Sequence, residues 1–283
     1  MDEDLRERER SVAAFYDAYG ADREWARFET PLGTPLGAVR AHVVAAFLGR
    51  WVRPGERVLD AGSGPGRFAL LLARRGARVT LLDISSVLLD DARRRFGAEG
   101  LTAEAFLRRS LFDVDQDLGR FDVVLCLGGA LDYYEGAMDR ALHLLRDRLA
   151  PGGRLVGSVM STVGGLASAL HAGWLPEPAV GGGDLRRVWA DGILTPAFSE
   201  HAAKMLTAQE LAALLGRSAL DLCDMSATDC LLALPQEQLL ALAGRGDLWA
   251  ALLELEVDAC RRMPEAGGHI LFAAEAAQAA EAP

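Results

Sequence analysis

The sequence of 283 residues has little positive charge and almost no lysine, since Lys204 is its only one. Arginine supplies the other basic side chains, and 40 acidic residues outnumber 30 basic ones, for a formal net charge of −10. Nucleic-acid binding depends on clustered Lys and Arg, so we expect no nucleic-acid partner. No apolar run reaches the roughly 20 residues of a membrane span, and we therefore expect no membrane partner.

Cysteines are few as well. The four of them, Cys126, Cys223, Cys230 and Cys260, are too far apart for the C-x-x-C spacing of metal or redox sites. We expect no metal, and free thiols packed as small apolar groups.

The N-terminus is charged and has no signal-peptide pattern, which predicts a cytoplasmic protein. A hydrophobic content of 51% is ample for a sizeable core.

The most informative stretch of the chain lies between residues 56 and 85. A short apolar run, Val58-Leu59, ends at Asp60, and glycines follow at every second position, 62, 64 and 66. A helical apolar pattern then covers 68–75. This order predicts a strand, a glycine turn that can approach a ligand closely, and a helix whose unpaired N–H groups point at that ligand. A second strand, 78–82, ends in Asp83, where a carboxylate can accept both hydroxyls of a ribose.

The glycine spacing indicates which nucleoside is bound. Dinucleotide enzymes use G-x-G-x-x-G, but Arg67 stands where the third glycine would be required. Asp60 would also repel a pyrophosphate, whereas it suits a cationic ligand.

The stretch Asp60-Ala-Gly-Ser-Gly-Pro-Gly66, followed by Asp83, resembles motif I of class I S-adenosylmethionine-dependent methyltransferases. A second stretch, Leu149-Ala-Pro-Gly-Gly-Arg-Leu155, resembles the turn before their fifth strand. The resemblance covers about residues 55–160. It implies an α/β fold, a Rossmann-like doubly wound sheet of seven mostly parallel strands with helices on both faces, plus an N-terminal helical cap and lid insertions. The implied cofactor is S-adenosyl-L-methionine.

The resemblance also implies roles for particular residues. Asp60 and the loop residues Gly62, Ser63, Gly64 and Gly66 would hold the methionine part, Asp83 the ribose, Ile84 and Leu111 the adenine faces, and the backbone of Leu127 and Gly128 the α-amino group. In the family an Asp after the third strand usually contacts the adenine amino group. Here Ser110 stands at that position, with Asp113 as the alternative.

The chain divides into segments of different character. We expect a helical cap at 1–53, a cofactor-binding core at 54–160, a lid at 161–206, the rest of the core at 207–276 with a helical insertion at 231–264, and a flexible tail at 277–283. The first helix, 2–20, either covers the cofactor pocket or simply docks on the core. Trp174 and Trp189 favour a lid that binds substrate. The insertion packs on the lid or forms a dimer contact, so the chain is predicted to be a monomer or a homodimer.

The predicted function is methyl transfer to a small-molecule acceptor, at oxygen, nitrogen or carbon. Leu127-Gly-Gly-Ala130 replaces the Asn/Asp-Pro-Pro-Tyr that marks amino-group methylation of adenine or glutamine. This argues against DNA, RNA and protein-glutamine substrates. The alternative is a cyclase or isomerase that keeps the fold, or a nucleoside-binding protein without methyl transfer.

A hydroxyl or amine acceptor can need a base, which is most often histidine. His201, close to the segment that re-enters the core at Thr207, is the first candidate, followed by Asp132 and Tyr133 after the fourth strand. His42 and His143 are expected on scaffold helices, and His269 is expected to make a structural hydrogen bond at the start of the last strand. Alignment of the acceptor without any protein base is the remaining alternative.

Overall fold

The computed structural model describes residues 3–27, 35–114, 118–171, 182–194 and 202–277. The helices are α1 (Glu3–Tyr19), α2 (Ala21–Ala26), α3 (Pro35–Trp51), α4 (Arg67–Arg74), α5 (Ser86–Ala98), α6 (Met138–Arg146), α7 (Thr162–His171), α8 (Gly182–Asp191), α9 (Ala208–Arg217), α10 (Gln236–Ala243) and α11 (Gly246–Arg262), with a 3-10 turn, η1, at Leu111–Asp113. The strands are β1 (Arg57–Ala61), β2 (Arg78–Asp83), β3 (Ala105–Arg108), β4 (Phe121–Cys126), β5 (Leu149–Met160), β6 (Ile193–Leu194), β7 (Ala203–Lys204), β8 (Leu220–Ala227) and β9 (His269–Ala276).

Seven strands form one sheet in the order β3-β2-β1-β4-β5-β9-β8. The first five are parallel, and β9 and β8 are antiparallel to their neighbours. The strand order reverses between β1 and β4, and ligands of open α/β sheets bind at the carboxyl ends of strands at such a switch point. This confirms the predicted fold class of a doubly wound, mostly parallel sheet.

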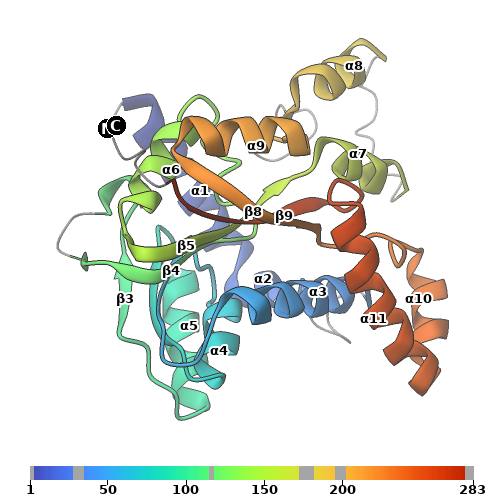
Figure 1. The fold of residues 1–283 in the computed structure, drawn as a ribbon, viewed down its shortest axis with the longest axis horizontal. Coiled ribbons are helices and arrows are strands. Elements are labelled where there is room, and N and C mark those ends of the chain that lie inside the picture. The colour runs from blue at the N-terminus through green and yellow to red at the C-terminus, as the bar shows by residue number, and fades with distance from the viewer. Residues whose placement is uncertain (1–2, 28–34, 115–117, 172–181, 195–201, 278–283) are drawn as a thin grey trace, which may run out of the picture.

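Helices cover both faces of the sheet (Figure 1). On one face α6 and α9 pack on the strands through Leu142, Leu145 and Leu211. On the other face α3, α4 and α5 bury residues such as Phe47 and Phe96. The parallel strands are buried on both sides, which is why β1, β2 and β4 read as nearly continuous apolar runs rather than as alternating ones.

Two helix starts follow from capping residues in the sequence. The Ser85 hydroxyl accepts the N–H of Leu88 at 3.1 Å and begins α5. Thr207 and Glu210 form a capping box at α9, in which each side chain accepts the backbone N–H of the other residue. Ser and Thr are among the residues that most often cap helices in this way.

The fifth strand is longer than the sequence indicated. It begins at Leu149, which pairs with Phe121, and continues through the Pro-Gly-Gly turn residues to Met160. The register of β4 and β5 shifts between Phe121 and Val123. A bulge of this kind absorbs extra residues without ending the pairing, so the expected start at Leu155 was wrong.

The insertion between β8 and β9 packs on the scaffold. Leu232 and Leu239 form a small cluster with Val39 of α3, and α10 and α11 lie beside α3 (Figure 1). The two helices are where the sequence predicted them, but they contact α3 rather than the described part of 161–206. That part contains α7, α8 and the β6–β7 ribbon, with a small core around Val188 and Met205.

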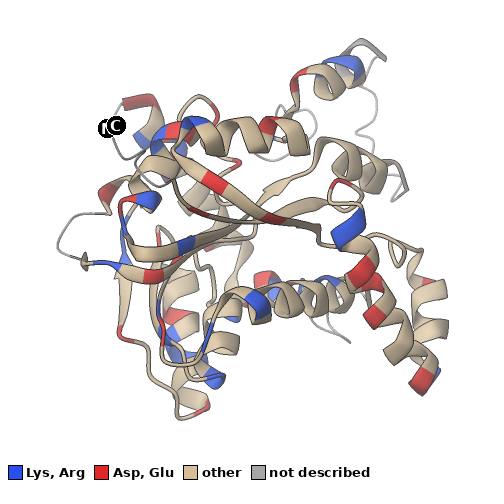
Figure 2. Ribbon diagram, in the orientation of Figure 1, with Lys and Arg blue, Asp and Glu red and all other residues tan. Residues whose placement is uncertain are grey.

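Charged residues of both signs are spread over the molecule in the view of Figure 2. Acidic and arginine side chains form pairs such as Arg74–Glu99 and Arg154–Glu56. Within the described ranges, no helix combines the length and the apolar character needed to cross a membrane.

We expect Gly157→Ala to destabilise the fold by about 1–3 kcal/mol, because a Cβ there would lie 2.4 Å from Cζ of Phe272 and 3.0 Å from the Cys126 carbonyl oxygen. The matched control is Gly97→Ala near the end of α5, where a Cβ meets nothing within 4 Å. That change should instead stabilise by roughly 0.5–1 kcal/mol. Urea unfolding of both variants measures the difference, and equal effects would contradict the packing described here.

Candidate functional site

A cavity opens at the carboxyl ends of β1, β2 and β4. Its volume is about 130 Å³. Most of the residues that the sequence assigned to a cofactor line it: Asp60, Gly62, Ser63, Gly64, Asp83, Ile84, Leu111, Leu127 and Gly128. The structure therefore brings together segments that are up to 68 residues apart in the chain.

The glycine turn is fixed to the end of β2. The N–H groups of Gly62 and Ser63 both donate to the carbonyl of Leu82, at 2.8 and 3.1 Å. The Gly64 N–H donates to Oδ2 of Asp83 at 2.7 Å. Gly62 has φ +78°, and a Cβ there would lie 2.7 Å from the Cβ of Ala130. Only glycine fits this close approach of the turn to the loop after β4.

Gly66 has a different role from the one predicted. It does not belong to the cavity wall but precedes α4 in the left-handed region, at φ +75°. A Cβ there would lie 2.8 Å from Cδ2 of Leu81. Its lack of a side chain thus allows α4 to pack against β2.

Two buried carboxylates meet at the floor of the cavity. Asp60 and Asp83 are only 3% and 8% exposed. Burial, and then the negative charge of Asp83, raises the pKa of Asp60 to about 7, and burial raises the pKa of Asp83 to about 6 despite N–H donors from Ser85 and Gly64. Neither forms an ion pair within the described part of the chain. A ligand with positive charge would relieve this repulsion.

The N-terminal helix closes one side of the cavity. Val12 and Tyr16 of α1 lie in its wall. The Tyr16 hydroxyl hydrogen-bonds that of Tyr133 at 2.8 Å, and Nη1 of Arg8 donates to the carbonyls of Tyr133 and Glu135 at 3.1 and 3.3 Å. This helix therefore lies along the cavity wall, where a cover would lie.

A buried acid that the sequence analysis missed holds the same helix down. Glu9 is 7% exposed, and its Oε1 accepts the hydroxyls of Ser110 at 2.5 Å and Tyr134 at 3.0 Å. Burial raises the pKa of Glu9. The signal was present in the sequence, because Glu9 falls between Leu5 and Val12 on the apolar stripe of α1.

This contact changes the expectation for Ser110. Its hydroxyl donates to Glu9 and accepts the N–H of Phe112, and the residue does not appear in the cavity wall. The alternative, Asp113, is exposed. Arg109 lines the cavity at this position instead.

The segment that forms much of this site is similar to a known protein family. Residues 58–153 match the family model described as a methyltransferase domain. This part of the chain is similar to a methyltransferase domain. The predicted resemblance to class I S-adenosylmethionine-dependent methyltransferases is thereby confirmed, and the matched range contains both motifs on which it was based.

One curated relative is the ubiquinone biosynthesis O-methyltransferase of Alkalilimnicola ehrlichii, 34% identical over 130 residues, which cover 44% of this chain and 49% of the relative. The chain spans less than two thirds of the length of the curated relatives it matches, for example 37%, 31% and 64%.

Two solved structures share the fold. One is the 1,6-didemethyltoxoflavin N1-methyltransferase of Burkholderia thailandensis, solved with 1,6-didemethyltoxoflavin and S-adenosylhomocysteine, at 18% identity and a TM-score of 0.58 over 96% of this chain and 90% of that one. The other is the (4+2)-cyclase SpnF, at 20% identity and a TM-score of 0.52 over 85% of this chain and 81% of that one.

The three residues predicted as catalytic are His201, Tyr133 and Asp132. His201 lies outside the described residues. Tyr133 lines the cavity, and burial raises its pKa, so its phenol stays protonated and serves as a hydrogen-bonding group. Asp132 lies behind the wall, where its Oδ2 accepts the N–H of Met160 and its carbonyl accepts that of Lys204.

A second, smaller cavity adjoins the first. It offers about 50 Å³ to the centre of a water-sized sphere and shares four wall residues with the larger one, namely Arg27, Phe68, Leu127 and Gly128. His269 lines it. His269 was expected to make a structural hydrogen bond. Because β9 is antiparallel to β5, it begins at the sheet edge where the parallel strands end, and this places His269 at the cavity.

The pKa values of Asp60 and Asp83 predict how stability depends on pH without ligand. In the folded chain both lie above the usual 3.8, so the stabilisation is greatest below about pH 4 and is lost as pH rises through about 6 and 7. Asp60→Asn should weaken this decline in unfolding free energy between pH 5 and 8. Asp90→Asn, at an exposed position of α5, is the control. Urea unfolding at several pH values tests this, and parallel curves for wild type and Asp60→Asn would contradict it.

Proposed function

We propose that the chain transfers a methyl group from S-adenosyl-L-methionine to a small-molecule acceptor. The observation that carries the proposal is the pair of buried carboxylates, Asp60 and Asp83, beside a glycine turn in an enclosed cavity. This donor set fits the cofactor, which has cationic sulfonium and ammonium groups and a ribose with two hydroxyls. It fits a dinucleotide less well, because Asp60 beside the glycine turn would repel the pyrophosphate.

The residues of the cavity would then divide the cofactor among them. Asp83 would accept the ribose hydroxyls, and Asp60 with the turn at 62–64 would hold the methionine part. Ile84 and Leu111 supply apolar contacts for the adenine, while the backbone of Leu127 and Gly128 faces the amino group. Ser110 is left out of this set, because its hydroxyl is bound to Glu9.

Bound S-adenosylmethionine supplies an electrophilic methyl group, so the chain mainly has to align the acceptor and exclude water. The cover formed by α1 would serve both purposes, because Val12 and Tyr16 line the cavity. In-line displacement of this kind requires no metal. No group of metal-ligating side chains occurs in the described part of the chain.

A small acceptor is supported by the enclosed shape of the site and by the acidic composition. The relatives named above include methyltransferases of ubiquinone biosynthesis and of 1,6-didemethyltoxoflavin, which are small molecules. The fold also occurs in a (4+2)-cyclase, so product masses have to be read to separate methyl transfer from cyclisation. The four cysteines are free thiols, which supports the predicted cytoplasmic location.

The division of the chain at 53, 160, 206 and 276 is part of the proposal. Residues 161–206 would cover the acceptor side, with His201 as a candidate base. Trp174 lies outside the described residues, and Trp189 is 59% exposed and lines neither cavity. A closing role for this segment therefore rests on its length and composition.

Asp83→Asn should weaken the binding of S-adenosylhomocysteine roughly 10- to 100-fold, because the ribose hydroxyls lose a charged acceptor worth about 1.5–3 kcal/mol. Asp90→Asn, with an exposed carboxylate on α5, should bind like wild type. Isothermal titration calorimetry of the three proteins measures this. Equal affinities would remove Asp83 from the site, and a wild type that binds NAD but not S-adenosylhomocysteine would refute the proposed cofactor.

A further inference from the structure

The second cavity combines polar groups that the cofactor does not need. Arg40, Ser158, Thr228 and His269 line it, together with apolar residues. Its volume of about 50 Å³ suits the reacting end of a small molecule. Because Leu127 and Gly128 belong to both walls, a group seated here lies next to the ligand of the larger cavity.

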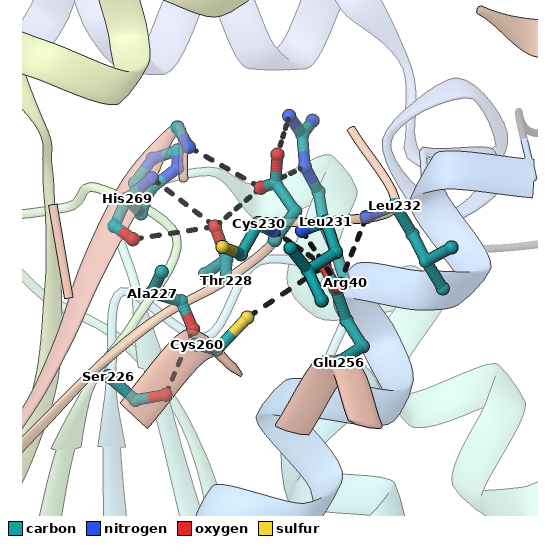
Figure 3. A network of polar contacts seen from close by, with 12 residues as sticks. Arg40, Ser226, Ala227, Thr228, Cys230, Leu231, Leu232, Glu256, Cys260 and His269 are labelled. Carbon is teal, nitrogen blue, oxygen red and sulfur yellow. Dashed lines mark hydrogen bonds and ion pairs between the residues drawn. The ribbon is translucent and has the colours of Figure 1, made fainter. Parts of the chain in front are cut away.

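The backbone of His269 is fixed on both sides. In the sheet it pairs with Met160 at the end of β5. Its N–H donates to Oγ1 of Thr228 at 3.2 Å, and its carbonyl accepts the N–H of Thr228 at 3.1 Å (Figure 3). A Cβ on Gly129 would lie 3.3 Å from Nε2 of His269, so the imidazole lies against the loop after β4.

An ion pair between the partly buried Arg40 and the buried Asp229 holds a positive charge beside this imidazole. Nε and Nη2 of Arg40 donate to the two oxygens of Asp229, at 2.8 and 3.3 Å. The Asp229 side chain is completely buried and also accepts the Thr228 hydroxyl at 2.9 Å. Figure 3 shows Arg40 reaching toward the same network that fixes His269. A guanidinium held in this way is pre-organised for an anionic group.

The charges around His269 come from several elements. Arg40 of α3 and Arg27 after α2 are positive, Asp229 after β8 is negative, and Asp132 after β4 approaches the same glycine, Gly129. Burial, followed by the positive charge of Arg40 and Arg27, lowers the pKa of His269 to about 4, although Asp229 opposes this. The imidazole is therefore neutral near pH 7 and can accept a proton.

We propose that the second cavity is the acceptor subsite, that it binds a small molecule through a weakly acidic O–H or N–H group, and that His269 is the base. The inference rests on the proposed methyl transfer. The acceptor's proton passes to the imidazole, and its lone pair forms the bond to the methyl carbon. The electrons of the broken carbon–sulfur bond remain on sulfur, which becomes a neutral thioether. His269 then returns its proton to solvent.

A base with a low pKa suffices for this reaction. As an oxygen or nitrogen gains the methyl group, its proton becomes far more acidic, so transfer to a weak base becomes favourable late in the step. Arg40 and Arg27 stabilise the partial negative charge that the acceptor oxygen or nitrogen carries before its proton leaves. Phenol-like or enol-like acceptors fit this arrangement better than aliphatic amines, which are cationic at neutral pH.

The test uses 4-nitrophenol as a probe on the full chain saturated with S-adenosylhomocysteine. Histidine labelled with ¹³C is observed by NMR, and the His269 signal is the one missing from His269→Asn, or from His269→Gln if the first variant does not fold. We expect the probe to shift this signal and to raise its titration midpoint, while the exposed His42 stays unchanged. A probe that leaves His269 unaffected, or shifts His42 equally, would overturn the inference.

Activity gives a second readout. With labelled S-adenosylmethionine and a panel of phenols and enols, His269→Asn should lower kcat by about 10²-fold or more, with a smaller loss at high pH where the acceptor ionises by itself. S-adenosylhomocysteine affinity should remain that of wild type, and His42→Asn should remain fully active. Full activity in His269→Asn would overturn the role of His269, whereas absence of S-adenosylhomocysteine binding in wild type would refute the proposed function itself.

Discussion

The structure depends on the burial of two like charges at the ends of adjacent strands. Asp60 is the last residue but one of β1 and Asp83 is the last residue of β2, and both carboxylates are buried beside the glycine turn. Such burial is costly without a partner. The backbone N–H groups of Gly64 and Ser85 reduce the cost at Asp83, and a cationic ligand would remove most of the rest. Binding of such a ligand would therefore relieve the electrostatic cost of burying the two carboxylates.

The N-terminal helix is held over this site by polar contacts rather than by a large apolar face. Glu9 binds the hydroxyls of Ser110 and Tyr134, which belong to the loops after β3 and β4. Tyr16 adds a contact to Tyr133. The helix therefore touches the loops that follow both strands. A cover attached by a few hydrogen bonds can open at a lower cost than one buried in the core, which suits a site that must exchange its ligands.

The sequence was sufficient where a local pattern determines the structure. The glycine turn, the caps at Ser85 and Thr207 and the order of strands follow from neighbouring residues and from a known family pattern. Glu9 and His269 were not predicted as site residues, because their partners are distant in the chain: Glu9 bonds residues 101 and 125 positions away. A local pattern carries no information about which loops a side chain will meet. The position of His269 was likewise not predictable from a local pattern, because the antiparallel direction of β9 determines the sheet edge at which its imidazole lies.

The wall between the two cavities explains why glycines follow β4. Gly128 has φ +72°, its N–H donates to Oγ of Ser158 at 2.9 Å, and a Cβ there would meet nothing within 4 Å. The space beside it is therefore open and belongs to both cavities. In the proposed reaction the methyl group crosses at this wall, so a side chain here would occupy the path between donor and acceptor. Gly129, by contrast, has no such space, because a Cβ would collide with Asp132 at 2.7 Å. Gly128 therefore keeps the space between the two cavities open. Gly129 lets the loop after β4 approach His269 closely enough to form part of the wall around it.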